Sequence, residues 1–344
     1  MTSPGGDLRA AQTGAALEYL SDLHDIATPH PERRRVTDPK AAADLIAAET
    51  VSRVQAVCER FPGDPVLLLS GGVDSILVAA AAVSVGIRPH TITVATPDSS
   101  DRTGASAAAA ALGLAHEVVE LDHATIVELA GEAVARLGLP ELWEVSYAIP
   151  LLAAVQSVDE LGAIGPILTG GGADAIFAGG RPLHHDLDSA EATAEMDQII
   201  RTESAANFTI TRLVPDFHER VLPAYAEKFV HMFQTLRWWE LSEQLAAPAL
   251  FGERDGQPVD KLAVRIAAEQ LLPAAAAPLA WAKKSPIQRS AGIMGALTEV
   301  AREFAAALPG AQTYTDPLTE PADAVAARLF LALLSDTDYR QNRS

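Results

Sequence analysis

The sequence is poor in cysteine and in basic residues, and each shortage excludes a class of protein. The 344 residues include one cysteine, Cys58. A single thiol cannot form an internal disulfide, an all-cysteine zinc site, an iron–sulfur cluster held by several thiolates, or a C-x-x-C redox pair. The 26 lysines and arginines stand against 45 aspartates and glutamates, which gives a net charge of −19. Because nucleic-acid binding needs a basic surface to replace phosphate counterions, we expect no nucleic acid as a main partner.

Aromatic residues and long apolar runs are also scarce. Aromatics make up 5% of the chain, whereas hydrophobic residues make up 49% and alanine is abundant. This balance is typical of a helix-rich enzyme rather than of a β-sandwich. The longest apolar stretch, residues 76–87, is too short to span a bilayer, and the first six residues lack the pattern of a signal peptide. We therefore expect a soluble, cytoplasmic protein with no membrane partner; the oligomeric state stays open, a homo-oligomer included.

Short apolar runs alternate with helical segments in the first half of the chain. Strands are expected at residues 66–69, 91–94, 116–121 and 166–169, with helices at 41–61, 76–85, 103–112, 123–137 and 148–161. This alternation predicts an α/β fold with a doubly wound parallel sheet. After about residue 186 no strand is expected. We predict a weakly ordered arm (1–38), an α/β domain (39–185) and a mostly helical subdomain (186–344).

A loop rich in glycine and serine follows the first expected strand and leads into a helix. It reads Ser70-Gly71-Gly72-Val73-Asp74-Ser75. Two glycines let the backbone approach an anion, and the helix N-terminus offers free N–H groups with a favourable dipole. A carboxylate repels phosphate unless a cation lies between them, so Asp74 indicates Mg²⁺. A plain turn that caps the helix is the simpler alternative, which the complete motif after a buried strand disfavours.

A second loop of the same design follows the fourth expected strand. Thr169-Gly170-Gly171-Gly172 ends this strand, and Asp174 opens the next helix. Two such loops on neighbouring strands would hold one Mg²⁺ and a pyrophosphate between Asp74 and Asp174. The alternative is a glycine-rich turn in which Asp174 only caps a helix.

At the first loop the sequence resembles the PP-loop ATP pyrophosphatases, which cleave ATP to AMP and pyrophosphate. The second loop, residues 168–180, looks like the corresponding loop of the asparagine synthetase C-terminal domain. Three further segments resemble that family in the same order, namely residues 91–121, 259–265 and 283–288. The resemblance covers about residues 40–300 and is strongest at the two glycine loops.

The resemblance implies ATP and Mg²⁺ as cofactors, ATP binding by the α/β domain (39–185) and an active site that the helical subdomain (186–344) completes. It also assigns roles to residues. The ATP base would lie near Leu68 and Val94, while Thr169 and Gly170 would contact the nucleotide from the other side. One lysine of the last segment would contact the phosphates and stabilise charge that develops during the reaction; Lys284 is the first choice and Lys283 the second. Full exposure to solvent is the ordinary alternative for both lysines. The remaining residues implied for nucleotide and metal binding are Ser70, Gly71, Gly72, Asp74, Ser75 and Asp174.

The sequence departs from the family at two places that matter for the reaction. Glutaminase-bearing relatives carry a nucleophilic cysteine at position 2, where this chain has Thr2, so we expect no glutaminase activity here. The family's loop glutamate, which acts near the acyl centre, is Gly171. Side chains that flank the site in sequence are open as replacements, although structural roles are common for such residues: Glu144, Tyr147, His184 and His185.

The sequence thus predicts ATP-dependent adenylation of a small-molecule carboxylate, followed by attack of an amine or ammonia that forms an amide or lactam. Pyrophosphate and AMP are the expected by-products, and a specialised biosynthetic pathway is the expected setting. Two alternatives stay open: adenylation of a nucleobase or another carbonyl, and a catalytically inactive nucleotide-binding scaffold.

Overall fold

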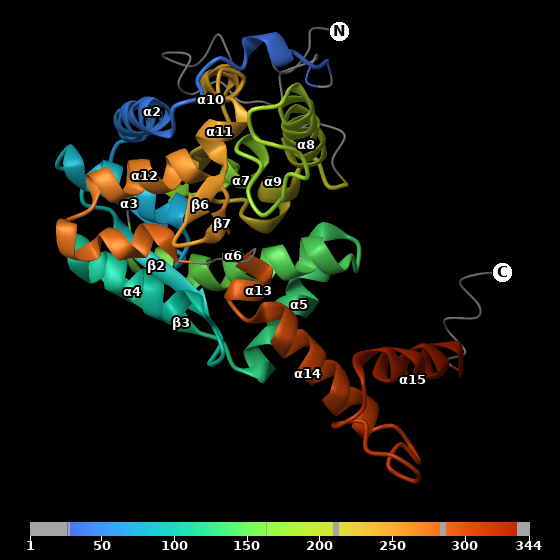
Figure 1. The fold of residues 1–344 in the computed structure, drawn as a ribbon. Helices are drawn as coiled ribbons and strands as arrows, with labels where there is room; N and C mark the ends of the chain where they lie inside the picture. Colours follow the sequence, from blue (N-terminus) through green and yellow to red (C-terminus); the bar gives the residue numbers. More distant parts are fainter. Residues whose placement is uncertain (1–25, 27, 163, 209–212, 283–286, 336–344) are drawn as a thin grey trace, which may run out of the picture.

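The structure is a computed structural model, and it describes residues 26, 28–162, 164–208, 213–282 and 287–335. A five-stranded parallel sheet forms its centre, with the strand order β3-β2-β1-β4-β5; its strands β2 and β3 are labelled in Figure 1. The strands are β1 (Asp64–Leu68), β2 (His90–Ala95), β3 (His116–Glu120), β4 (Ile164–Thr169) and β5 (Phe229–His231). The predicted doubly wound parallel sheet is therefore confirmed.

Helices connect and cover the strands. Those of the first half are α2 (Pro39–Arg60), α3 (Val73–Ser84), α4 (Asp101–Leu112), α5 (His123–Leu137), α6 (Leu142–Glu160) and α7 (Ala173–Ile176). Those that follow are α8 (Ala190–Phe208), α9 (Phe217–Val221), α10 (Leu236–Ser242), α11 (Ala247–Leu250), α12 (Leu262–Leu271), α13 (Ile287–Ser290), α14 (Ile293–Ala306) and α15 (Ala322–Ser335). Among the described residues there are also three 3₁₀ segments: η3 (Pro31–Arg33), η4 (Ala226–Lys228) and η5 (Ala274–Trp281). No described helix is long and apolar enough to traverse a bilayer.

The two faces of the sheet form two hydrophobic cores, because successive strand side chains point in opposite directions. On β1, Leu67 packs into the core made with α2, α3 and α12, whereas Val66 packs into the core made with α5, α6 and α9. Val230 and Phe229 of β5 divide in the same way. The central strands β1 and β4 are thus buried on both faces, as the continuous apolar runs predict, whereas β3 at the edge of the sheet is only half-buried.

The expectation that strands end near residue 186 is wrong. Strand β5 pairs in parallel with β4, and a hairpin follows, formed by β6 (Gly252–Arg254) and β7 (Gln257–Val259). All three strands are three residues long, which is too short for an apolar pattern to stand out. The boundary near residue 185 stays a prediction, although β5 shows that the second part contributes to the central sheet.

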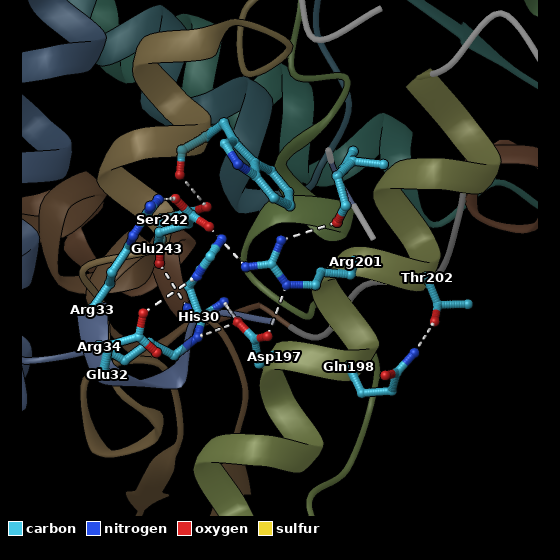
Figure 2. A network of polar contacts seen from close by, with 12 residues as sticks. His30, Glu32, Arg33, Arg34, Asp197, Gln198, Arg201, Thr202, Ser242 and Glu243 are labelled. Carbon is cyan, nitrogen blue, oxygen red and sulfur yellow. Dashed lines mark hydrogen bonds and ion pairs between the residues drawn. The ribbon is translucent and has the colours of Figure 1, made fainter. Parts of the chain in front are cut away.

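Residues 28–38 of the predicted N-terminal arm are among the described residues. They pack against α8 and α10 through a buried ionic network (Figure 2). Arg34 contacts Asp197 of α8 with Nε at 2.8 Å and Nη2 at 2.6 Å, and neither side chain is more than 1% exposed. Arg201 bonds the other oxygen of Asp197 at 2.8 Å and Glu243 at 2.7 Å. The network fixes the chain just before α2 against α8 and α10. Apart from residue 26, the rest of the predicted arm (residues 1–25 and 27) lies outside the described residues.

Candidate functional site

The strand order creates a natural site between β1 and β4. Within the sheet, β2 and β3 lie on one side of β1, whereas β4 and β5 lie on its other side. The loops after β1 and β4 therefore diverge at a topological switch point, where open α/β sheets bind ligands. Leu68 and Thr169, the last residues of these strands, are direct partners in the sheet. The expectation that the two glycine loops follow neighbouring strands is confirmed.

The first glycine loop is closed by its own serines. The hydroxyls of Ser70 and Ser75 lie 3.0 Å apart, and the N–H of Ser70 donates to Ser75 Oγ at 3.1 Å. Helix α3 begins after Gly72, and no side chain caps its N-terminus. The uncapped first turn is suited to an anion, since unpaired N–H groups and the helix dipole both favour negative charge.

Asp101, the first residue of α4, binds the first glycine loop. Its Oδ1 accepts the Gly71 N–H at 3.1 Å, and its Oδ2 accepts the Ser290 hydroxyl at 2.7 Å. The carbonyl of Ser290 in turn accepts the N–H of Ser100 at 3.0 Å. Asp101 therefore joins the first glycine loop, the start of α4 and the end of α13.

The second glycine loop lies so close to the start of α3 and the end of β5 that only glycine fits at positions 170 and 171. A Cβ on Gly170 would lie 2.7 Å from the Ser75 nitrogen, inside contact distance of backbone at the start of α3. A Cβ on Gly171 would lie 2.3 Å from His231 Nδ1 at the end of β5. The absence of side chains at 170 and 171 thus brings the two loops and β5 together at one edge of the sheet.

One lysine contacts the carboxylates of both glycine loops. Lys261 Nζ lies 2.8 and 3.0 Å from the carboxylate oxygens of Asp74 and 2.5 Å from Asp174 Oδ1. The side chains of Lys261 and Asp74 are 5% and 4% exposed, whereas that of Asp174 is 59% exposed. Burial alone would lower the pKa of Lys261, but the two carboxylates outweigh burial and raise the pKa above its ordinary value. Two carboxylates and one ammonium leave one negative charge at this position.

The local fold explains how Lys261 reaches this place. It is the N-cap residue of α12 and adopts a left-handed conformation with φ of 49°. Its neighbour Asp260 accepts the Gly180 N–H at 2.6 Å and the Arg265 guanidinium at 3.1 Å. This anchoring costs the strain of a non-glycine residue at positive φ and turns the lysine back across the sheet edge.

A cavity of about 510 Å³ opens beside the two loops. Most of the residues that the sequence predicts for the site line it: Leu68, Ser70, Asp74, Ser75, Thr169, Gly170 and Asp174. Gly71 and Gly72 lie in the same loop without being among its lining residues, and Val94 does not line the cavity. Val94 instead packs, partly buried, against the core on the α5–α6 side of the sheet. The predicted phosphate lysines Lys283 and Lys284 lie outside the described residues and stay a prediction.

The four candidate replacements for the loop glutamate divide into two pairs. Glu144 and Tyr147 of α6 line the cavity. His184 and His185 do not: both bond Glu195 on the surface, at 2.6 and 3.0 Å. The hydrogen bonds from His184, and to a smaller extent the one from His185, lower the pKa of Glu195 to about 2. A local surface cluster therefore accounts for the two histidines.

Sequence reasoning missed three side chains of the site. Lys261 falls within a segment that carries a family resemblance, but nothing in its spacing shows that it reaches Asp74. His218 and His231 also line the cavity. The hydrogen bond between Thr169 and His231 joins residues 62 positions apart, and its only sequence signal is a histidine that closes a short apolar run.

The fold and the site define a parallel α/β protein with two glycine loops and a charged bridge at the switch point. The family model for asparagine synthase matches residues 55–255. The chain belongs to the asparagine synthase family.

The chain is also similar to a curated relative and to two solved structures. The chain is 28% identical over 190 residues to the carboxyethyl-arginine beta-lactam-synthase of Streptomyces clavuligerus, which is 52% of this chain and 36% of that protein. It thus spans about a third of that relative's length. Solved structures with 15% and 14% identity are the NMN synthetase of Francisella tularensis and the NAD+ synthetase of Burkholderia pseudomallei. Their TM-scores are 0.32 and 0.28, with 71% and 58% of this chain and 98% and 89% of theirs covered.

Proposed function

We propose that the protein adenylates a small-molecule carboxylate with ATP and passes the acyl group to an amine or ammonia. Family membership and the beta-lactam synthase relative support amide or lactam formation as the kind of reaction. The observation that carries the proposal is the pair of carboxylates, Asp74 and Asp174, held on one ammonium where two neighbouring parallel strands end. Such a cluster, with one net negative charge, suits a polyphosphate that brings a divalent cation with it.

The residues present fit a magnesium ion. Two carboxylates plus phosphate oxygens are the donors that Mg²⁺ takes in nucleotide sites, and the Lys261 contact shows that the carboxylates converge on a cation. Asp74 and Asp174 would hold Mg²⁺, which when bound would neutralise phosphate charge. The N-terminus of α3 and Lys261 would bind the pyrophosphate end of ATP.

The reaction then takes two steps. A carboxylate oxygen of the substrate attacks the α-phosphorus of ATP; the bond to the bridging oxygen breaks, and pyrophosphate leaves. A nitrogen nucleophile next attacks the acyl carbon, the bond to the AMP oxygen breaks, and an amide forms. Positioning and leaving-group stabilisation supply the catalysis, so no covalent enzyme intermediate is needed.

The test is to incubate the protein with Mg·ATP and a panel of amino acids and other carboxylates. AMP and pyrophosphate are the expected products. ADP as the product would contradict the proposal, and nucleotide binding without turnover of any acid would favour the scaffold alternative. Asp74→Asn and Asp174→Asn should each lower exchange of labelled pyrophosphate into ATP by about 10²-fold or more. Asp255→Asn, at a side chain that is 93% exposed, is the control.

A further inference from the structure

Two histidines form a hydrogen-bonded pair at the wall of the cavity. His231 Nδ1 lies 2.9 Å from Thr169 Oγ1, and His231 Nε2 lies 3.0 Å from His218 Nε2. His231 is 8% exposed. The His218 ring stacks on Phe229 at 5.1 Å and meets Tyr147 edge-on at 6.5 Å. Both imidazoles are thus fixed in orientation beside the second glycine loop.

The pair occupies the space above Gly171. A Cβ at this position would lie 2.3 Å from His231 Nδ1 and 3.0 Å from Thr169 Oγ1. Any side chain at 171 would therefore displace the His231 ring. Glycine in the loop and histidine on β5 are two parts of one arrangement, in which the histidine provides the titratable group at that point of the cavity wall.

The hydrogen bonds are compatible with a His218 ring whose lone pair is on Nδ1. Gly171 N–H donates to Thr169 Oγ1 at 3.1 Å, and the second lone pair of this oxygen can accept from His231 Nδ1–H. In this tautomer His231 Nε2 accepts from His218 Nε2–H, and Nδ1 of His218 is the atom that can take up a proton. One proton lies between the two Nε2 atoms, and a further proton enters or leaves the pair through Nδ1 of His218. Protonation of the pair spreads one positive charge over two rings.

We propose that His218 is the catalytic base that accepts the proton of the nitrogen nucleophile, and that His231 is the positioning residue that orients it. This inference rests on the proposed function. As the amine attacks the acyl carbon of the adenylate, the C–N bond forms and the bond from carbon to the AMP oxygen breaks. AMP leaves with the electron pair, and the N–H proton passes to His218. The products are the amide, AMP and one proton held by the pair.

The other titratable groups of the cavity wall are less suited to this step. Asp74 and Asp174 are both bound to Lys261, and Glu203 is ion-paired with Arg181. Tyr147 packs on Phe217 with ring centroids 5.2 Å apart. Glu144 of α6 is the remaining acidic group in the lining, and the experiment includes it as the competing base. An imidazole is also the side chain whose ordinary pKa suits proton uptake near neutral pH.

The experiment separates acyl-adenylate formation from its capture. Wild type, His218→Gln, His231→Gln and Glu144→Gln receive Mg·ATP and the carboxylate panel, with either ammonium chloride and a panel of amino acids or hydroxylamine as nucleophile. Hydroxylamine is a weakly basic amine that is largely unprotonated at neutral pH, so its capture does not need a base. His123→Gln on α5, whose side chain is 46% exposed, is the matched control.

We expect His218→Gln to lower amide formation by about 10²-fold or more, while pyrophosphate exchange and hydroxamate formation stay unchanged. The rise of the amide-forming rate with pH should disappear in this variant. His231→Gln should weaken amide formation less and shift the pH profile. Equal loss of amide and hydroxamate, no loss of either, or the expected signature in Glu144→Gln instead would overturn the assignment. Absence of exchange and hydroxamate in wild type would overturn the proposed function itself, and the assignment with it.

A second measurement covers a variant that does not fold. In the wild-type protein, ¹⁵N resonances of the two rings should titrate as a coupled pair. Two independent titration curves would contradict the shared proton and overturn the assignment without any substrate.

Discussion

Replacing Lys261 by methionine removes the ammonium between two carboxylates and keeps an apolar stem of similar length. At 2.8 Å the attraction between Lys261 and Asp74 is about 6 kcal/mol for an effective dielectric constant near 20. Desolvation of the pair offsets part of this, and removing one partner of a buried ion pair costs about 3–5 kcal/mol. Asp174 adds about 1 kcal/mol at most, because its side chain is 59% exposed. We expect a loss of about 3–5 kcal/mol in the free energy of unfolding.

Urea denaturation followed by tryptophan fluorescence measures this loss. Lys40→Met, at an exposed position of α2, is the control and should change the free energy of unfolding by less than about 0.5 kcal/mol. The double variant Asp74→Asn/Lys261→Met should be more stable than the sum of the single losses predicts, since the second change removes the unpaired charge. A loss below about 1 kcal/mol for Lys261→Met, or strict additivity, would refute the account of the bridge.

The pH dependence and the response to metal sharpen the same prediction. The pKa of Lys261 is raised by its two partners, so its contribution is fully present below the unfolded value of about 10.4 and is lost only above it. The difference between wild type and Lys261→Met should therefore be flat from pH 6 to about 9. Without the ammonium, two carboxylates face each other, and Mg²⁺ alone should raise the urea midpoint of the variant more than that of wild type.

Three further predictions concern other parts of the structure. Gly171→Ala should displace the His231 ring, since its Cβ would lie 2.3 Å from Nδ1, and lower stability by about 1–3 kcal/mol in thermal unfolding; Gly171→Ala/His231→Ala should recover much of this, and no recovery would contradict the steric account. Arg34→Met should cost about 3–5 kcal/mol in urea unfolding because it breaks a buried pair with Asp197, whereas Arg33→Met, at a side chain that is 53% exposed, should cost less than about 1 kcal/mol. Burial raises the pKa of the Cys58 thiol to about 11, so iodoacetamide at pH 8 should label the native protein about 100-fold more slowly than the unfolded chain; equal rates would show that the thiol is not shielded.

The sequence predicts the parallel sheet and its two glycine loops because their signals are local. Val66 and Leu67 are buried on opposite faces of the sheet, so both must be apolar, and the loop that follows the strand is recognisable by Ser70 and two glycines. Strand β5 escapes prediction because it is three residues long and gains its place by pairing with β4.

The chemistry of the site is less visible, because its partners meet only in three dimensions. Lys261 lies 187 positions from Asp74, and it reaches the carboxylates through a left-handed turn that no spacing rule predicts. Sequence reasoning chose Lys284 instead, which stays a prediction. Gly171 shows the limit most clearly: the sequence reveals a missing carboxylate, and only the packing reveals the imidazole in its place.

The bonds of Asp101 have a consequence for chimeric or recombined variants of this protein. One carboxylate accepts from Gly71 in the first glycine loop and from Ser290, which lies six residues after Lys284 in the sequence. A crossover anywhere between residues 101 and 290 would separate these partners unless both parents carry them. In any chimera, the first glycine loop, Asp101 and Ser290 should therefore come from the same parent.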